Sequence, residues 1–281
     1  MPMLLSLGHG YSAAALARLL LAEGWAVAGT TRSAAKAEAL RAGGIVPILW
    51  PGDLSEALER ATHILASAAP DAGGDPFLRA APQIAAAKAE WVGYLSTTAV
   101  YGDHKGGWVD EDTPPNPASE RGRWRVGAEA EWRATGLPLH IFRLAGIYGP
   151  GRGPFEKVRN GTARRIVKPG QVFGRIHVED IAATLRASIA RPDPGAIYNL
   201  TDDDPAPPED VIAEAARLLG LPIPPAIPFD QAELTPMARS FYGESKRVRN
   251  DRIKRDLGVA LRYPDYRSGL AALLADSTPG S

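Results

Sequence analysis

The stretch from residue 3 to residue 24 constrains the fold more than any other part of the chain. An apolar run at 3–7 is long enough for one buried strand, and apolar residues at helical spacing then continue to Gly24, a natural helix stop. Between the two lie Gly8 and Gly10, with Ala13 at the third position of a G-x-G-x-x-G pattern. The pattern predicts a strand, a tight turn and a helix whose amino end binds the diphosphate of a dinucleotide.

Two alternatives to this interpretation are an ordinary strand–helix turn and a secretory signal peptide. A signal peptide needs a basic region before its apolar core, and none precedes Leu4. The glycines alone are weak evidence, but a second apolar strand follows at 25–30, as a dinucleotide-binding unit requires. We therefore expect the loop to contact the cofactor through Gly8, His9, Gly10, Tyr11 and Ser12.

Composition excludes several kinds of site. Lys plus Arg and Asp plus Glu both number 32, so the net charge does not direct the chain to nucleic acid or to an acidic membrane surface. The chain has no cysteine, which excludes disulfides, thiolate nucleophiles and cysteine-based zinc sites. No apolar run reaches the roughly 18 residues that a membrane-spanning helix needs. We expect a cytoplasmic protein with no metal ion and no nucleic-acid or membrane partner.

The end of the second strand bears on which dinucleotide binds. NAD-selective folds of this type place Asp or Glu there to bind the ribose hydroxyls, whereas this chain has Thr31, Arg32 and Ser33. A carboxylate would repel the 2′-phosphate of NADP, while Arg32 would pair with it and Ser33 could donate a hydrogen bond to it. The alternative is an arginine on a solvated loop. The sequence thus favours NADP over NAD.

Further strands and helices alternate along the chain with short connections. Apolar runs predict strands at 45–49, 63–67, 91–95, 139–144 and 195–200, and helical periodicity predicts helices at 33–43, 77–89, 119–135, 178–190, 211–219 and 266–275, with a frayed tail after them. Residues 239–242 and 246–248 are expected to form short strands or loops. Such alternation is typical of a doubly wound parallel sheet, which binds ligands at the carboxyl ends of its strands. At those ends we expect cofactor contacts from Ala68, Ala69, Leu144, Ala145 and Gly146.

Four motifs, taken in order, resemble the extended short-chain dehydrogenase/reductases. They are the glycine loop, TTAVYGD at 97–103, RLAGIYGPG at 143–151 and IHVEDIA at 176–182. This family includes the nucleotide-sugar epimerases and dehydratases, and the stretch 245–264 resembles an atypical, epimerase/dehydratase-like branch. The resemblance implies a Rossmann-type core at 1–150, completed by about 176–200, and a small substrate lobe at 151–281 that is interleaved with the core.

The chain departs from the family at the catalytic positions. The family's reaction uses a Ser or Thr, a Tyr and a Lys, the last two spaced Y-x-x-x-K on the helix after the fifth strand. Thr97 matches the hydroxyl position, but Arg121 and Arg125 stand at the Tyr and Lys positions. An arginine, with a pKa above about 12, cannot act as a general acid or base. Arg125 could still bind the nicotinamide ribose, and Arg121 could hold an oxyanion or a substrate carboxylate.

A proton donor must then lie elsewhere in the chain. Tyr101 and Tyr148, both expected at strand ends, are the first candidates, and His104 and His177 come after them. The alternative role for the two tyrosines is packing. For His177 the alternative is capping of the following helix.

A basic segment follows the sixth strand. Against Glu156 alone, it carries Arg152, Lys157, Arg159, Arg164, Arg165, Lys168 and Arg175. A basic lining would suit an anionic substrate such as a diphosphate or carboxylate. A solvated surface balanced by the acids at 202–204 is the alternative.

The sequence therefore predicts an NADP-binding oxidoreductase or epimerase/dehydratase for a small anionic substrate, nucleotide-linked compounds included. The rival is a non-catalytic NADP sensor or scaffold that has lost the Tyr/Lys chemistry. The two arginines favour the rival, while Thr97 and the basic segment favour the enzyme. The quaternary state stays open: relatives commonly pair through the helices after the fourth and fifth strands, so the resemblance allows a homodimer, and Trp124 or Trp132 could lie at its seam.

Overall fold

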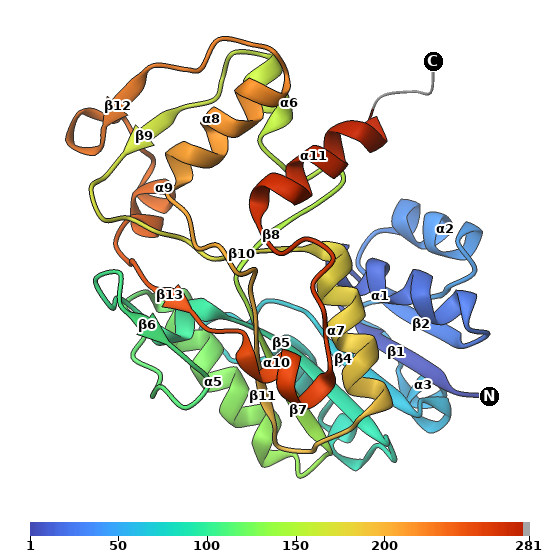
Figure 1. The fold of residues 1–281 in the computed structure, drawn as a ribbon. Helices are drawn as coiled ribbons and strands as arrows, with labels where there is room; N and C mark the ends of the chain where they lie inside the picture. Colours follow the sequence, from blue (N-terminus) through green and yellow to red (C-terminus); the bar gives the residue numbers. More distant parts are fainter. Residues whose placement is uncertain (278–281) are drawn as a thin grey trace.

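Seven parallel strands form the central sheet of the protein, which a computed structural model describes over residues 1–277 (Figure 1). β1 lies near the middle; the chain adds two strands on one side of it and then four on the other. Across the sheet the order is β11 (Ile197–Leu200), β7 (Leu139–Leu144), β5 (Trp91–Thr97), β4 (His63–Ala66), β1 (Met3–Leu7), β2 (Ala26–Thr31) and β3 (Val46–Leu49). The predicted doubly wound, Rossmann-type sheet is confirmed.

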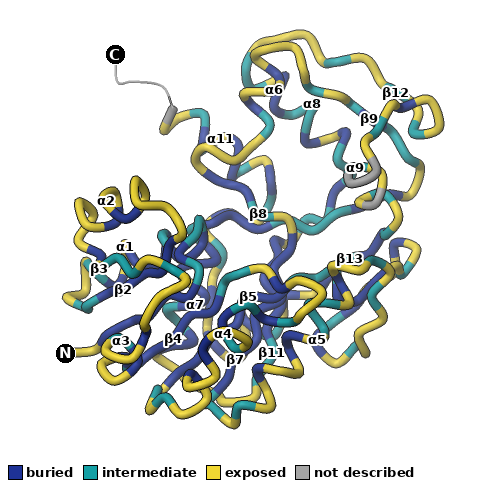
Figure 2. Tube along the Cα trace, turned by 180° about the vertical axis from the view of Figure 1, so that it is seen from behind, coloured by how far each residue is buried: buried dark blue, intermediate teal, exposed yellow. Residues whose placement is uncertain are grey.

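Helices cover both faces of this sheet, and each face has its own apolar core. One core holds Leu16, Ile181 and Ile253, from α1 (Tyr11–Ala22), α7 (Val178–Ala190) and α10 (Asp251–Leu257). The other core holds Leu58, Phe77 and Trp132, from α3 (Ser55–Arg60), α4 (Pro76–Ala80) and α5 (Glu120–Ala134). The strands between the two layers are buried almost throughout, as Figure 2 shows in dark blue, except for the exposed edge strand β3.

A smaller group of elements, here the small lobe, lies beyond the carboxyl ends of the strands (Figure 1). Its own apolar cluster includes Phe155, Val211, Tyr266 and Leu270. Its elements are α6 (Phe155–Arg159), β9 (Arg165–Val167), α8 (Pro208–Leu218), β12 (Ala226–Pro228), η3 (Phe229–Gln231), α9 (Pro236–Phe241) and α11 (Tyr266–Ser277).

Two short parallel pairs lie between the small lobe and the sheet. β8 (Gly146–Tyr148) pairs with β10 (Arg175–His177), and β6 (Trp108–Val109) pairs with β13 (Arg247–Val248). The second pair joins segments that are far apart in the sequence. It fixes the chain near residue 246 beside the loop that follows η2 (Thr98–Tyr101).

Three local predictions need correction. The helix expected at 77–89 is two short pieces, α4 and η1 (Pro82–Ala86), because Pro82 cannot continue an α-helix. Residues 239–241, expected as strand or loop, belong to α9, and α3 was not predicted at all. The predicted spans 139–144 and 178–190 coincide with β7 and α7. The tail expected after α11 lies at 278–281, outside the described residues.

Within residues 1–277, no helix is both long enough and apolar enough to span a membrane.

Candidate functional site

A cleft of about 1090 Å³ lies between the sheet and the small lobe, at the carboxyl ends of the strands. Gly10 and Ser67 mark the ends of β1 and β4, and Thr97 and Leu144 mark the ends of β5 and β7. The chain leaves β1 toward one edge of the sheet and β4 toward the other, so the cleft lies at the topological switch point. Ligands of doubly wound sheets bind at this point.

The glycine loop fits a close approach by a diphosphate. Gly8 has a φ of +80°, and a Cβ there would lie 3.0–3.2 Å from atoms of Ala68, so no larger residue fits. Gly10 is the N-cap of α1 and has no capping side chain, and it lines the cleft with Tyr11 and Ser12. The first N–H groups and the positive end of the α1 dipole therefore face an anion at this position.

His9 does not make the contact expected of it. Its backbone N–H donates to the carbonyl of Thr30 at 3.1 Å, and its ring packs under the loop, where a Cβ on Gly29 would lie 2.9 Å from it. Burial lowers the pKa of His9 to about 4, with the charge of Lys36 adding to the effect, so the ring is neutral near pH 7. The prediction that His9 binds the cofactor is wrong for its side chain and for its N–H.

The end of β2 carries two cations that do not line the cleft. Arg32 is exposed, Thr31 is buried, and Ser33 caps α2 (Ala34–Ala42) by accepting from the N–H of Lys36 at 3.3 Å. The ammonium of Lys36 donates to the carbonyl of His9 at 2.5 Å and therefore lies over the glycine loop. Lys36 was not among the predicted site residues, although a lysine at the third position of the helix after the second strand was the available signal.

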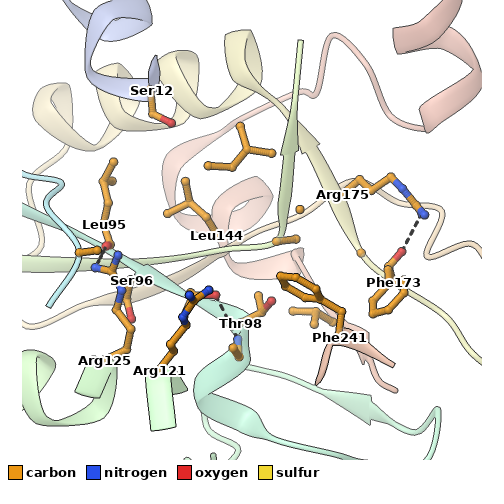
Figure 3. Close-up of a pocket in the computed structure, with 18 of the residues that line it drawn as sticks. Ser12, Leu95, Ser96, Thr98, Arg121, Arg125, Leu144, Phe173, Arg175 and Phe241 are labelled. Atoms are coloured by element: carbon orange, nitrogen blue, oxygen red, sulfur yellow. Dashed lines mark hydrogen bonds between the residues drawn. The ribbon is translucent and has the colours of Figure 1, made fainter. Parts of the chain in front are cut away.

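Arg125 and Arg121 enter the cleft side by side from α5, as Figure 3 shows. Arg125 Nη1 lies 2.8 Å from the carbonyl of Leu95, 3.0 Å from the hydroxyl of Tyr94 and 3.2 Å from the carbonyl of Ala68, and so bridges the ends of β4 and β5. Arg121 is exposed and has no hydrogen bond or ion pair to another residue of the described chain. One arginine is thus fixed by the fold, and the other is available to a ligand.

The hydroxyl of Thr97 lies at the start of η2. It accepts a hydrogen bond from the N–H of Ala99 at 3.2 Å and keeps its own proton for a ligand in the cleft. Of the predicted site residues, the structure brings ten into this one cleft: Gly10, Tyr11, Ser12, Ala69, Thr97, Arg121, Arg125, Leu144, Ala145 and Gly146. Gly8 and Ala68 shape the adjoining loop, while Thr31, Arg32 and Ser33 lie at the end of β2.

The prediction that Tyr101 donates a proton is wrong. Tyr101 is fully buried, its hydroxyl donates to Asn199 Oδ1 at 2.8 Å, and Arg143 Nη1 donates to it at 3.1 Å. Burial raises its pKa, although the charge of Arg143 opposes the rise. Tyr148 is also buried, and its hydroxyl lies 3.4 Å from the carbonyl of Asp265. Neither hydroxyl lines the main cleft.

Two histidines take structural roles. His177 Nδ1 accepts from the N–H of Glu179 at 3.2 Å and so caps α7, which confirms the alternative role stated for it. Burial lowers the pKa of His177 to about 4. His104 Nε2 lies 3.1 Å from the carbonyl of Tyr101 and does not line the cleft.

Only part of the basic segment that follows the sixth predicted strand lines the cleft. Arg152 and Arg175 reach the cleft, and the other five cations do not. Arg175 Nη1 donates to the carbonyls of Phe173 and Ala206, both at 3.0 Å, so its charge is fixed at the wall that Figure 3 shows opposite α5. Asp202 lies beside it, accepting weakly from the Arg175 N–H at 3.5 Å, and burial raises the pKa of Asp202 to about 8.

The chain after residue 240 contributes lining residues that were not predicted from the sequence. Phe241, Glu244 and Lys246 line the cleft, although they lie more than 100 residues beyond the end of α5 in the sequence. Trp124 lines the cleft as well, whereas Trp132 is fully buried and donates to Asp75 Oδ2 at 3.0 Å. Trp132 is therefore excluded from a dimer seam. Among the described residues no cluster of His, Asp or Glu forms a metal site.

No protein-family model matches the chain. Among proteins of known sequence, Protein YeeZ of Escherichia coli is 31% identical, with the match covering 92% of this chain and 95% of YeeZ. The 3-diazoavenalumate denitrifying reductase of a Streptomyces species is 28% identical over 58% of each chain.

Solved structures also match this chain along nearly its whole length. A conserved protein of unknown function from Silicibacter pomeroyi superposes with a TM-score of 0.93 at 62% identity, covering 99% of this chain and all of that one. UDP-glucuronic acid 4-epimerase from Bacillus cereus, in complex with NAD, has a TM-score of 0.77 at 18% identity, covering 99% and 100% of the two chains. The human epimerase family protein SDR39U1, with NADPH, has 0.76 at 19% identity, covering 98% and 100%. The last two share the fold.

Proposed function

The chain belongs to the extended short-chain dehydrogenase/reductases, and on that premise we propose that it is an NADP-dependent oxidoreductase for a small anionic substrate. One observation carries the proposal: the open amino end of α1, the fixed guanidinium of Arg125 and the hydroxyl of Thr97 all line one cleft. The first would hold the diphosphate, the second the nicotinamide ribose, and the third the reacting oxygen of the substrate. A bound nicotinamide supplies the hydride.

The charges at the end of β2 support NADP as the cofactor. Arg32 and Lys36 both follow β2, and Lys36 already lies against the glycine loop through the carbonyl of His9. No carboxylate stands at 31–36 to bind ribose hydroxyls or to repel a phosphate. We propose that these two cations pair with the 2′-phosphate.

The charge of the cleft supports an anionic substrate. Apart from Arg125, its basic lining residues are Arg121, Arg152, Arg175 and Lys246, and Glu244 is its one acidic lining residue in the described chain. A basic, partly enclosed cleft attracts carboxylates and phosphates and pairs with them. Aromatic rings beside Arg175 add apolar surface (Figure 3). We propose that the small lobe and the segment after it form the substrate side of the site.

The direction of the reaction is proposed from the relatives. A relative at 28% identity is named as a reductase, which supports hydride donation to the substrate. Arg121, in place of a proton donor, would stabilise negative charge on the substrate before and during hydride transfer. The rival role, an NADP sensor without chemistry, is supported by the same arginine, so the decisive test is turnover.

The experiment measures NADPH binding by fluorescence and NADPH oxidation with carbonyl compounds of matched size, such as 4-carboxybenzaldehyde and 4-methylbenzaldehyde. We expect saturable binding, and faster oxidation with the carboxylate than with its neutral counterpart. Arg121→Gln should remove most of that preference while leaving NADPH affinity unchanged. NADPH binding without turnover across anionic aldehydes, ketones and nucleotide sugars would favour the sensor.

A further inference from the structure

The cleft needs a source of protons that the family positions do not provide. When a hydride adds to a carbonyl carbon, the C–H bond forms, the π electron pair moves to oxygen, and that oxygen must take a proton. Arg121 and Arg125 hold their protons too tightly to give one. The donor must therefore be found among the other side chains that line the cleft.

Three hydroxyl groups in the lining already donate their protons within the protein, and a fourth caps a helix. Tyr11 donates to the carbonyl of Pro150 at 2.9 Å, Ser67 to the carbonyl of Gly8 at 2.6 Å, and Ser96 to Glu129 Oε1 at 2.6 Å. Ser119 caps α5 by accepting from the N–H of Gly122 at 3.2 Å. Aliphatic hydroxyls such as that of Thr97 can relay a proton but need a partner that replaces it.

Lys246 and Glu244 are the lining residues that can serve as that partner. Lys246 Nζ donates to Glu244 Oε2 at 2.7 Å and to the carbonyl of Gly102 at 2.8 Å. The two side chains are only 10% and 14% exposed, yet both line the cleft. An ammonium has three N–H bonds, so one remains for a ligand after these two contacts.

The backbone around Lys246 holds it firmly beside the end of η2. Ser245 receives hydrogen bonds on its carbonyl from the N–H groups of His104 and Gly106, at 3.1 and 2.8 Å, and its own N–H donates to Asp103 Oδ1 at 2.9 Å. Gly102 directly follows η2, which begins next to Thr97. The ammonium of Lys246 is thus hydrogen-bonded to Gly102, at the end of the short segment that begins with Thr97.

We infer that Lys246 is the proton donor of this site, with Glu244 as the positioning residue that holds its ammonium; the inference rests on the proposed function. An N–H bond of Lys246 breaks as the O–H bond of the product forms, either directly or through the Thr97 hydroxyl. The neutral amine then recovers a proton from solvent. Taken together, the carbonyl substrate, NADPH and one proton give the alcohol and NADP⁺.

The test compares Lys246→Ala, Lys246→Arg and Glu244→Gln with Lys88→Ala, an exposed lysine outside the cleft. With 4-carboxybenzaldehyde, Lys246→Ala should lower kcat about 100-fold or more, the range for loss of a general acid, at unchanged NADPH affinity. Added methylamine should restore part of the rate. Lys246→Arg keeps the charge and the pairing with Glu244 but should stay slow, because arginine does not release its proton. Glu244→Gln should lose less than Lys246→Ala.

A second readout does not depend on turnover. In protein labelled with ¹³C-lysine and saturated with NADP⁺, the Lys246 Cε resonance, assigned with Lys246→Arg, should shift on addition of the unreactive dianion terephthalate. The Lys88 resonance should not move. Full activity in Lys246→Arg or Lys246→Ala, or an unmoved Lys246 resonance, overturns the inference while the proposed function stands. Absence of wild-type turnover despite NADPH binding overturns both.

Discussion

Glu129 on α5 and Arg143 on β7 form a buried, two-point ion pair beneath the cleft. Arg143 Nη2 lies 2.8 Å from Glu129 Oε2, and Arg143 Nε lies 3.1 Å from Oε1. Burial alone would raise the pKa of Glu129, but hydrogen bonds from Arg143 and Ser96 outweigh it, so the pKa is lowered and the carboxylate stays charged. The pair fixes α5 against the sheet and thereby sets where Arg121 and Arg125 enter the cleft.

Removing this charge should destabilise the fold. Glu129→Gln leaves the guanidinium of Arg143 buried with only neutral partners, which typically costs about 3–5 kcal/mol in the free energy of unfolding. Glu120→Gln, an exposed change on the same helix, should cost less than about 1 kcal/mol. Urea denaturation measures both. A loss for Glu129→Gln no larger than its control would show that Tyr101, which itself donates to Asn199, suffices to hold Arg143.

Gly10→Val should block the cofactor and spare the fold. The backbone of Gly10 is extended, with φ −112°, and a Cβ there would meet only the carbonyl of Gly8, at 3.6 Å. The added side chain would occupy space where a diphosphate approaches the backbone, so NADPH affinity should fall by roughly tenfold or more. Gly127→Ala on α5 has open space around it and is the control. Unchanged affinity in Gly10→Val would mean that the diphosphate binds elsewhere.

The two cations after β2 should discriminate between the dinucleotides. A charge-assisted hydrogen bond contributes about 1.5–3 kcal/mol, so Arg32→Ala and Lys36→Ala should each weaken NADPH binding by roughly tenfold or more, with little change for NADH. Arg41→Ala, at the far end of α2 and paired with Glu38, should change neither. Isothermal titration with both cofactors gives the answer. Equal losses for NADPH and NADH would rule out the 2′-phosphate contact.

Asp202 should make stability depend on pH. Burial raises its pKa to about 8, against an ordinary value of 3.8, although the charge of Arg175 opposes the rise. The folded protein therefore holds one more proton than the unfolded chain between about pH 4 and pH 8, and its stability falls as pH rises through that window. Asp202→Asn cannot ionise and should flatten this fall by a few kcal/mol at most. Melting temperatures at about pH 5 and pH 8 measure it, with the exposed Asp230→Asn as control. An equal change in melting temperature between the two pH values for Asp202→Asn and the wild type would contradict this prediction.

Local patterns predicted much of the fold and ten of the residues that line the cleft. β7 and α7 match their predicted spans because the apolar residues that define them, and the residues that end them, are neighbours in the sequence. The glycine loop, Thr97 and the two arginines of α5 were found in the same way, since each belongs to a contiguous motif. In such a motif the local backbone alone fixes where the residues lie relative to one another.

The remainder depends on contacts between distant residues. The burial of Tyr101 follows from its bonds to Arg143 and Asn199, and the place of Lys246 follows from its bond to Gly102, 144 positions earlier in the chain. Strand-end position alone made Tyr101 look accessible. No local periodicity reports such pairings, because they are set by tertiary packing and by the short β6–β13 ladder.

The β6–β13 ladder also bears on how the protein is made. The cleft is walled by residues from Gly10 to Val248, so its far side is missing until translation has passed residue 248. A nascent chain that has completed all seven sheet strands still lacks the wall that carries Glu244 and Lys246. Ribosome-bound or proteolytically shortened forms that stop before residue 244 are thus expected to present an open, one-sided groove in place of the cleft.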